Sequence, residues 1–560
     1  MRLERSTILM IALLVVLGFL ILYPLLMLVY GSLRGGGPGT QSGFTISGYV
    51  AAITNVDNYK VLWTTFWLSV VRAVLSMALA IFLAWVVTRT DTPWRKGLEF
   101  LIWMVFLGLP YLPALISWTL LAGPKGFINQ FLMNLLHLDK PIFNIYSYGG
   151  IIWTSMTFWA SIIFILITPA FRGMDASLEE SSRTLGGNGL TTLRKITVPM
   201  LAPAILGVTI LVLVRFMESF ETELMLGYPA GIYVYATKIW WLLGTMPADF
   251  PQAMALSIIF LGIILVLIFS QWLLIGKKQF VTITGRGFAT RPMRIGRWKY
   301  VTFGLVILYF ITAFVLPIAT MILGSFMKVW GVWQAQPFTL DNWAATFENP
   351  TVYRSLWNTL IVGFGSATLG MILYSLTSYI VVKTQFKGKK LLDMLTWLPW
   401  SVPALILALG FLWAYVGGLP FLSPLYGTVW LLIIVFIVRG FPLGGRVMNA
   451  SMHQLGKELE ESSRVLGGSW LFTFRRIVAP LLSPAFISAW LILFVITVRD
   501  VVTVVYLYQP QSRVISISLL EHWIASEYEI AITYGVIMAV MVIGAAFLGR
   551  YLGSKQQIIA

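Results

Sequence analysis

Long apolar stretches alternate with short polar segments along almost the whole chain. A helix that crosses the hydrocarbon core of a bilayer, roughly 30 Å thick, needs about 20 predominantly apolar residues. About twelve stretches meet this length, and each predicts a membrane-spanning helix. They lie near residues 7–30, 62–88, 98–122, 150–171, 200–226, 253–276, 301–327, 356–382, 391–415, 426–447, 481–508 and 532–553.

The composition agrees with this pattern. The chain has 560 residues, of which 58% are hydrophobic and 11% charged, whereas soluble domains carry about 25% charged residues. A soluble protein of this size still needs a polar surface, so a soluble globular fold and a disordered chain are both excluded. The sequence therefore predicts an all-α membrane protein.

The chain offers little material for catalysis or metal binding. It has no cysteine and only three histidines, which are far apart in the sequence. We expect no disulfide, no thiolate nucleophile and no metal site. No catalytic residue is assigned.

Most basic residues lie in every second segment between the predicted spans, which places them on one side of the membrane. The net charge is +17, and most Lys and Arg residues lie in the segments on the same side as the N-terminus. Short cytoplasmic loops carry such an excess of Lys and Arg. We therefore expect a multi-pass protein with both termini in the cytoplasm, and we expect the charge to reflect topology and not nucleic-acid binding.

Several segments of the first half recur in the second half in the same order. The stretch 62–65, Leu-Trp-Thr-Thr, recurs at 356–359 as Leu-Trp-Asn-Thr, and both predicted helices run to a basic residue followed by threonine, at Arg89 and Lys383. The Pro-Ala-Leu-Ile segment at Pro113 also recurs at Pro403. This order indicates a duplicated six-helix unit.

The duplication predicts the domain organisation. Residues 1–276 form a first six-helix unit, 277–300 a basic cytoplasmic linker, and 301–560 a second six-helix unit. Because each unit has an even number of spans, the copies share one orientation, with a pseudo-twofold axis along the membrane normal and a pathway between them.

The strongest repeat lies between spans, on the predicted cytoplasmic side. Residues 178–205 read LEESSRTLGGNGLTTLRKITVPMLAPAI, and residues 459–486 read LEESSRVLGGSWLFTFRRIVAPLLSPAF, without a gap. Paired glycines permit a sharp turn, and Pro199 and Pro480 fit the first turn of a following helix. The pattern predicts a short helix, a turn and a second short helix, presented twice.

These loops resemble the EAA loop in permeases of bacterial type I ABC importers. The spacing of Glu180, Gly186, Ile196 and Pro199 fits that motif. Serines replace its paired alanines, and Val198 or Ala479 replaces its leucine before proline. The alternative is a solvated amphipathic connector, which leaves the gapless repeat unexplained. The resemblance implies an ATPase-coupling role for Glu179, Glu180, Gly186, Gly187, Ile196, Pro199, Glu460, Glu461, Gly467, Gly468, Ile477 and Pro480.

The resemblance also implies the partners. The sequence contains no G-x-x-x-x-G-K-[ST] phosphate loop, so ATP and Mg are expected on two separate ATPase subunits and no cofactor on this chain. An extracytoplasmic substrate-binding protein and a bacterial inner membrane are implied as well. Residues 219–239 resemble fused permeases of the ferric-iron subfamily. Thiamine, polyamine and aminoethylphosphonate importers are the alternatives.

A few charged residues fall within or near the ends of the apolar spans. Arg72, Arg215 and Arg499 lie inside them, where each costs about 2.5–3.5 kcal/mol at a helix centre, so we expect each to face the bundle interior and to be paired. Arg215 and Glu218 can meet on one helix face, and Glu221 and Glu223 are expected near the outer mouth. Structural pairing and a lining of the translocation path are both open for Arg215, Glu218, Glu221, Arg499 and Asp500.

Two other classes of protein remain to be weighed. A membrane-embedded enzyme needs a convergent set of catalytic groups, and no such set is recognisable in the sequence. An ion-coupled secondary transporter would carry broken helices with intramembrane carboxylates, but it would leave the paired loops without a purpose.

Overall fold

The computed structural model describes residues 5–174, 177–275, 292–329, 332, 336–456 and 458–557. Within these ranges the regular structure is helical, with isolated bridges in place of strands, which confirms the predicted all-α fold. In this described part of the chain, ten helices are long and apolar enough to cross a membrane, or up to 12 if each of two bent pairs is one span. The predicted number of spans is therefore confirmed.

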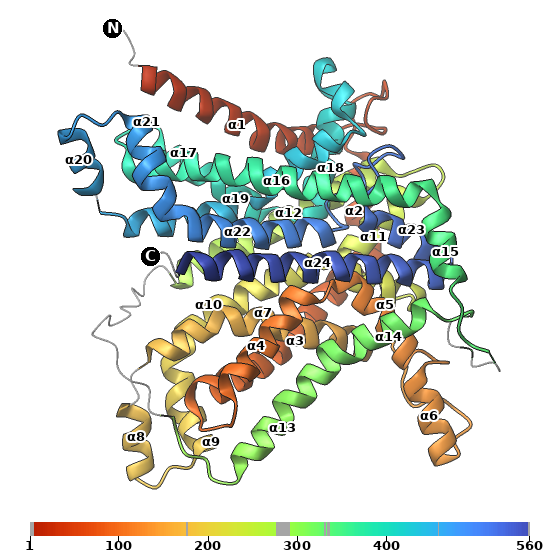
Figure 1. Cartoon of the computed structure of the whole chain (residues 1–560). Helices are drawn as coiled ribbons and strands as arrows, with labels where there is room; N and C mark the ends of the chain where they lie inside the picture. The colour runs from red at the N-terminus through yellow and green to blue at the C-terminus, as the bar shows by residue number, and fades with distance from the viewer. Residues whose placement is uncertain are drawn as a thin grey trace. The chain divides into compact units, whose positions relative to one another are not determined.

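The chain divides into two compact units (Figure 1). The N-unit comprises Ile53–Trp241 and Gly262–Trp343, and the C-unit comprises Met1–Ala52, Leu242–Leu261 and Ala344–Ala560. Each unit therefore contains the first helix of the other half of the sequence. The boundaries at 276 and 301 stay a sequence prediction, and residues 277–291, most of the predicted linker, lie outside the described part of the chain.

The helices of the N-unit come from both halves of the sequence. Short π-helical turns follow α9 and α13 at Leu193–Thr197 and Ile311–Val315. The α-helices are α3 (Val56–Arg89), α4 (Arg95–Gly108), α5 (Tyr111–Ala122), α6 (Phe127–Leu136), α7 (Tyr148–Gly173), α8 (Ser177–Thr184), α9 (Gly189–Thr192), α10 (Val198–Met217), α13 (Trp298–Phe310) and α14 (Leu316–Ser325).

The C-unit contains the first helix of the chain and the second half. A π-helical turn at Phe474–Val478 follows α21. The α-helices are α1 (Arg5–Ser32), α2 (Ser47–Thr54, whose last residues pass into the N-unit), α16 (Pro350–Lys383), α17 (Lys389–Trp397), α18 (Ala404–Val416), α19 (Val429–Gln454), α20 (Glu458–Val465), α21 (Trp470–Thr473), α22 (Ala479–Arg499), α23 (Ile515–Ile524) and α24 (Tyr528–Gln557). Three further helices, α11 (Tyr235–Gly244), α12 (Phe250–Ile275) and α15 (Asp341–Glu348), cross from one unit to the other.

Helix α1 packs along α18 inside the C-unit. The approach is close, because a Cβ atom at Gly410 would lie 2.7 Å from the carbonyl oxygen of Pro24. The hydroxyl of Tyr23 accepts a hydrogen bond of 2.9 Å from the backbone N–H of Leu419. On other faces of α1, Val15 and Leu26 are 63% and 66% exposed, as expected of side chains that face lipid.

The longest helices, α3 and α16, reproduce the repeat in detail. Both have 34 residues. Each begins after an asparagine, Asn55 or Asn349, whose side chain accepts a hydrogen bond from the backbone N–H two residues further on, a standard N-cap. Both end before a threonine in extended conformation. The sequence duplication therefore reaches the ends of the helices.

A threonine at the same position of each long helix accepts a hydrogen bond from the first residue of a short helix. The Oγ1 atom of Thr65 accepts a hydrogen bond of 2.9 Å from the N–H of Tyr235, the first residue of α11. The Oγ1 atom of Thr359 accepts one of 2.8 Å from the N–H of Ile515, the first residue of α23. The two contacts make α11 and α23 structural equivalents.

Two of the predicted spans are not continuous. The stretch 98–122 bends by 100° between α4 and α5, and the stretch 391–415 bends by 111° between α17 and α18. In each case the residue before a proline, Leu109 or Val402, is extended, because the proline ring disfavours the helical conformation of its predecessor. The breaks align Pro110 with Pro403, so the sequence match between Pro113 and Pro403 was wrong.

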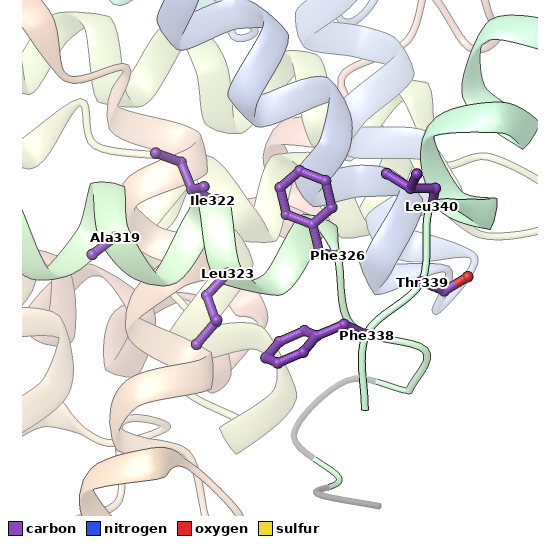
Figure 2. Close-up of a pocket in the computed structure, with 7 residues that line it drawn as sticks. All are labelled: Ala319, Ile322, Leu323, Phe326, Phe338, Thr339 and Leu340. Atoms are coloured by element: carbon purple, nitrogen blue, oxygen red, sulfur yellow. The ribbon is translucent and has the colours of Figure 1, made fainter. Parts of the chain in front are cut away.

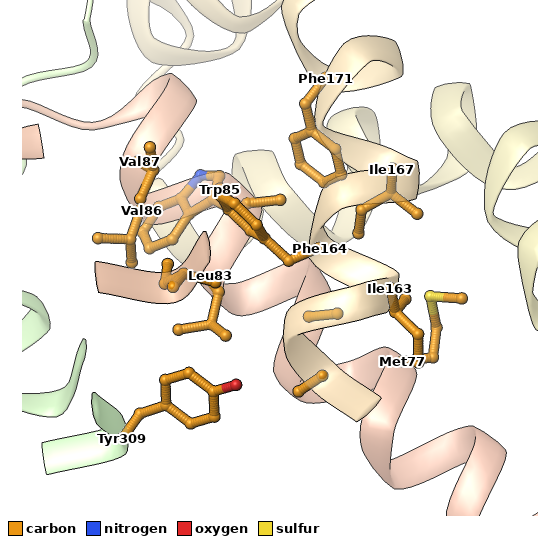
Figure 3. Packing of buried hydrophobic residues seen from close by; sticks show 14 of the residues in the cluster. Met77, Leu83, Trp85, Val86, Val87, Ile163, Phe164, Ile167, Phe171 and Tyr309 are labelled. Carbon is orange, nitrogen blue, oxygen red and sulfur yellow. The ribbon is translucent and has the colours of Figure 1, made fainter. Parts of the chain in front are cut away.

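The core of the N-unit lies between α3 and α7 (Figure 3). Trp85, Phe164 and Phe171 are buried there among aliphatic side chains. Tyr309 of α13 closes the cluster, and its hydroxyl donates a hydrogen bond of 2.9 Å to the carbonyl oxygen of Thr157. This core fixes the end of α3 from which Arg89 reaches the site described next.

Candidate functional site

The two loops of the internal repeat have the same geometry. In the N-unit, α8 ends in a turn at Gly186, and α9 and a π-helical turn lead directly into α10. In the C-unit, α20, Gly467, α21 and a π-helical turn lead into α22 in the same way. Figure 1 shows α8 and α20 beyond the ends of the long helices of their units. The predicted helix–turn–helix is present twice.

The glycines of the turn have a definite role. The φ angles of Gly186 and Gly467 are 86° and 81°, in the left-handed region that residues with a Cβ rarely adopt. The backbone N–H of the next glycine, Gly187 or Gly468, donates to the carbonyl oxygen of Ser182 or Ser463 at 2.9 and 2.8 Å. The turn thus satisfies a carbonyl at the end of the helix.

The serines that depart from the family motif close the loop. The hydroxyl of Ser182 lies 3.0 Å from that of Thr192, and the hydroxyl of Ser463 lies 2.7 Å from that of Thr473. Alanine could not form this bond. The substitution therefore ties the first short helix to the second in both units.

The first glutamate of each pair points into its unit. Glu179 is 5% exposed; its Oε1 accepts a hydrogen bond of 2.6 Å from Thr197, and its Oε2 lies 3.6 Å from Nη1 of Arg89. Arg89 also donates to the carbonyl oxygens of Phe171 and Met174. The loop is thereby joined to the end of α3.

The C-unit repeats this contact with other residues. The Nζ of Lys383, at the end of α16, lies 3.5 Å from Oε1 of Glu460 and donates to the carbonyl oxygen of Leu455 at 2.6 Å. The hydroxyl of Tyr379 donates to Oε2 of Glu460 at 3.0 Å. The basic residue is thus repeated, whereas the additional hydroxyl donor comes from a different helix.

The other predicted coupling residues lie toward the surface. Glu461, Pro199 and Pro480 are exposed, and Ile196 and Ile477 are half-buried. The side chain of Glu180 lies outside the described part of the structure. Around them large apolar side chains face outward: Leu185 at 88%, Leu190 at 71%, and Val465 and Leu466 each at 87% exposure. An exposed apolar patch framed by charges is typical of a protein-binding surface.

Arg72 is buried and paired, as expected for a charge within a span. It is fully buried on α3, and its Nη1 lies 2.6 Å from Oε1 of Glu223, which is also fully buried. The guanidinium donates to the carbonyl oxygen of Phe216, and Ser219 donates to the other oxygen of Glu223. The expectation that Glu223 lies at the outer mouth was wrong, because α10 ends at Met217 and the chain folds back into the unit.

The remaining charged candidates form two further pairs. Arg215 and Glu218 meet at 2.9 Å on one helix face, as predicted. Asp500 pairs with Arg439 of α19, and its Oδ1 accepts the N–H of Thr503 at 2.8 Å. Glu221 and Arg499 are half-buried. Their role in a translocation path stays a prediction.

Sequence reasoning missed Arg439 as a charge within a span. The residue lies in the middle of the predicted stretch 426–447, so its position marks it as a buried charge that needs a partner. Glu179 was assigned only to docking, although the basic residue that ends both long helices signals an internal partner. Neither partner could be assigned without the fold.

The N-unit also contains a groove with an apolar lining. A groove of about 630 Å³ runs along the end of α14, where Phe326 and Phe338 face each other across it (Figure 2). Apart from Thr339 its lining is hydrocarbon, so it offers little to recognise a polar solute. Among the described residues, no three His, Cys, Asp or Glu side chains gather at one point.

Known transport proteins are similar to this chain in the region that contains the second repeated loop. Residues 366–557 match the family described as binding-protein-dependent transport system inner membrane component. The ferric transport system permease protein FbpB of Actinobacillus pleuropneumoniae is 30% identical over 440 residues, which cover 76% of this chain and 61% of that protein. The Fe(3+)-transport system permease protein FbpB 2 of Haemophilus influenzae is 22% identical over 409 residues, 70% of this chain and 76% of that protein.

A polyamine permease matches a smaller part. The spermidine/putrescine transport system permease protein PotC of Haemophilus influenzae is 24% identical over 188 residues, 33% of this chain and 71% of that protein. The chain spans about three fifths of the length of the Actinobacillus relative. Residues 366–557, which include the second loop, are therefore similar to the inner membrane components of binding-protein-dependent transport systems, in a chain whose described residues include at least ten helices able to cross a membrane.

Proposed function

We propose that the chain is the membrane permease subunit of an ATP-driven importer that moves ferric iron from an extracytoplasmic binding protein into the cytoplasm. The observation that carries the proposal is the repeated loop, with one turn geometry and one type of internal ion pair in both units, buried in the N-unit and half-buried in the C-unit. Two equivalent docking surfaces suit two ATPase subunits. The family description, which names a dependence on binding proteins, supports the third component.

The geometry suggests how ATP hydrolysis is coupled to transport. The apolar side chains around Leu185 and Leu466 would seat in the ATPase subunits, which bind ATP and Mg. Closure of the ATPases would move α8 and α20. The ion pairs from Glu179 to Arg89 and from Glu460 to Lys383 would pass that movement to the ends of α3 and α16. A second route runs through the π-helical turns into α10 and α22.

Ferric iron is the cargo favoured by similarity. The relatives named for ferric iron align over 70% or more of this chain, whereas the polyamine permease aligns over 33%. A thiamine, polyamine or aminoethylphosphonate cargo would leave the coupling proposal intact.

Reconstitution tests the proposal. The permease, its ATPase and the iron-loaded binding protein are placed in proteoliposomes, and uptake of radioactive ferric iron is followed. We expect uptake that requires all three components and ATP. Uptake driven by an ion gradient without ATP would instead establish a secondary transporter, and uptake of another solute in place of iron would replace the cargo.

The orientation of the loops can be tested separately, in whole cells. Because the chain has no cysteine, a single cysteine introduced as Leu185→Cys or Leu466→Cys reports its own side of the membrane. In cells, we expect both to resist a membrane-impermeant thiol reagent and to react after the membrane is opened. Labelling of either position in intact cells would refute the cytoplasmic placement of that loop.

A further inference from the structure

A short helix of the N-unit leaves the bundle with large apolar side chains exposed. Helix α6 follows α5 and projects away from the other helices of its unit (Figure 1). On this helix Phe131 is 65% exposed, Leu135 60% and Leu136 54%. Exposed apolar surface of this kind marks contact with another protein or with lipid, so the helix requires a partner outside its unit.

The apolar side chains of α6 form a stripe along the helix. Ile128, Phe131 and Leu135 are spaced by three and four residues, which places them on one face. Gln130 and Asn134 are four residues apart and lie on another face. A short helix divided in this way into an apolar and a polar face is typical of segments that lie on the surface of a bilayer.

The direction of α6 fits a membrane surface and not a span. The run Tyr111–Leu136, which comprises α5 and α6, is bent by 100° from α4, and Figure 1 shows this change of direction. Helix α4 packs against α7, which is long and apolar enough to cross a membrane. With ten residues, α6 is also only about 15 Å long, about half the thickness of the hydrocarbon core.

Hydrogen bonds fix the base of α6 at the level where α5 ends and α7 begins. The side-chain amide of Asn129, which is fully buried, donates to the carbonyl oxygens of Gly123 and Phe143, both at 2.7 Å. The N–H of Ile145 donates to the carbonyl oxygen of Ala122 at 3.1 Å, and α7 begins three residues later. The 26 residues of α7 extend about 39 Å, so its first turn lies at a membrane surface.

We propose that α6 is an interfacial anchor: a helix that lies in the headgroup region of the bilayer, with Phe131, Leu135 and Leu136 in contact with the acyl chains. Its level, its direction across the spans and its apolar stripe all fit this position. Helix α6 precedes α7 and α8 follows it, so the two lie on opposite membrane surfaces. The outer leaflet is therefore the one that holds α6, and this assignment of the leaflet rests on the cytoplasmic α8 loop proposed above.

The residues around α6 also fit a lipid surface. Leu138 and Ile142 are exposed and continue the apolar surface beyond the helix. Lys125 before the helix and Lys140 after it are exposed, and lysines beside an interfacial helix are attracted to lipid phosphates. Asp139 is the one acidic residue between 123 and 147.

Lipid is a better partner for this stripe than the substrate-binding protein. A binding protein arrives only for delivery, and between deliveries the exposed apolar side chains of α6 would face water, which is unfavourable in proportion to their area. Lipid is present at this level at all times. The exposed Tyr148 and Trp153 at the start of α7 are of the aromatic type that is enriched at membrane surfaces.

The fold of a unit does not require this helix. In the N-unit, residues 123–147 connect α5 to α7, whereas in the C-unit the shorter segment 417–428 connects α18 to α19. The C-unit segment is described throughout and carries a 3-10 helix, Pro420–Leu425, in place of an amphipathic α-helix. Because the two copies share their other main helices, α6 has a role of its own.

Spin labels on single cysteines test the anchor, since the chain has no cysteine of its own. Phe131→Cys, Leu135→Cys and the matched control Asn134→Cys change exposed residues and are labelled in nanodiscs. The accessibility of each label to oxygen, which concentrates in lipid, is compared with its accessibility to a water-soluble nickel chelate. We expect oxygen to dominate at 131 and 135 and nickel at 134, and equal nickel accessibility at all three positions would refute the anchor.

Addition of the substrate-binding protein distinguishes a lipid partner from a protein partner. A helix already covered by lipid should show the same nickel accessibility at 131 and 135 with and without the binding protein. If nickel reaches both labels in the permease alone and is excluded only when the binding protein is added, the lipid anchor is wrong and α6 is a protein-docking surface.

Thiol labelling in intact cells separates this inference from the proposed function. Asn134→Cys, on the polar face of α6, should react with a membrane-impermeant thiol reagent in intact cells, whereas Leu185→Cys should react only after the membrane is opened. The reverse pattern, found together with lipid-covered labels at 131 and 135, would refute the proposed orientation and the outer leaflet but leave the interfacial position of α6 intact. A failure of iron uptake would likewise leave the anchor standing.

Discussion

The carboxylate of Glu179 lies 3.6 Å from the guanidinium of Arg89, which joins the first short helix of the N-unit loop to the end of α3. The same relationship between Glu460 and Lys383 joins α20 to α16. The first glutamate of each loop is therefore an internal contact. The exposed Glu461, one residue further on, is free to face a partner protein.

Glu179→Gln should weaken the attachment of α8. The change removes the carboxylate charge that faces the buried guanidinium of Arg89, and breaking a buried ion pair costs about 3–5 kcal/mol. We expect a lower melting temperature of the isolated permease and less transport per ATP hydrolysed in the reconstituted importer. Both are measured on the same preparation.

Glu461→Gln serves as the control for that variant, because its side chain is exposed. It should leave the melting temperature of the permease unchanged and weaken only the binding of the ATPase. Equal melting temperatures for wild type and Glu179→Gln would show that the ion pair contributes nothing to the loop.

Gly186→Ala should distort the turn between α8 and α9. A Cβ in the left-handed conformation costs about 1–2 kcal/mol, and the same holds for Gly467→Ala. We expect each variant to bind the ATPase more weakly, measured by co-purification. Gly304→Ala, at an exposed position inside α13, should bind it normally; a turn variant that binds equally well would argue against this surface as the docking site.

Glu223→Gln should destabilise the N-unit strongly. Arg72 and Glu223 are both fully buried. Removing the carboxylate charge leaves the arginine charge buried without it, which lowers the free energy of unfolding by about 3–5 kcal/mol. Replacing both, in Arg72→Leu with Glu223→Leu, should recover most of the loss. Thermal unfolding in detergent provides the comparison, and a double variant no more stable than the single one would point to a role beyond pairing.

Thr65→Val and Thr359→Val should have similar effects on their own units. Each removes the acceptor of a buried backbone N–H, which costs about 1–3 kcal/mol. Thr377→Val removes only a bond to the preceding turn of α16 and should cost less. Hydrogen exchange at Tyr235 and Ile515 is the measurement; protection that stays unchanged in both variants would contradict the equivalence of α11 and α23.

Much of this arrangement could be predicted from the sequence, because lipid imposes simple length and polarity rules on helices. The spans, the all-α fold and the two loops follow from apolar stretches and a gapless repeat. The bends at Leu109 and Val402 were missed because hydropathy is continuous across them, although the prolines that cause them are visible in the sequence.

Partnerships between distant residues are harder to predict. Nothing near Glu223 in the sequence indicates Arg72, since the end of α10 and the return of the chain decide that contact. In the same way, a buried Glu179 and an exposed Glu461 stand in nearly identical sequence segments. Which of two neighbouring glutamates faces inward depends on how the short helix is rotated about its axis. That rotation is set by how the helix packs against the rest of its unit.

The placement of α1 in the C-unit and of α13 and α14 in the N-unit bears on biogenesis. During translation α4 and α5 leave the ribosome long before α14, which packs on α5, so the N-unit stays unfinished until the second half has begun. Conversely, α1 is synthesised first and cannot complete its packing in the C-unit until α18 has been made. Expressed as two separate polypeptides, each half would lack a helix that the other half supplies, whereas one continuous chain provides these helices in equal number.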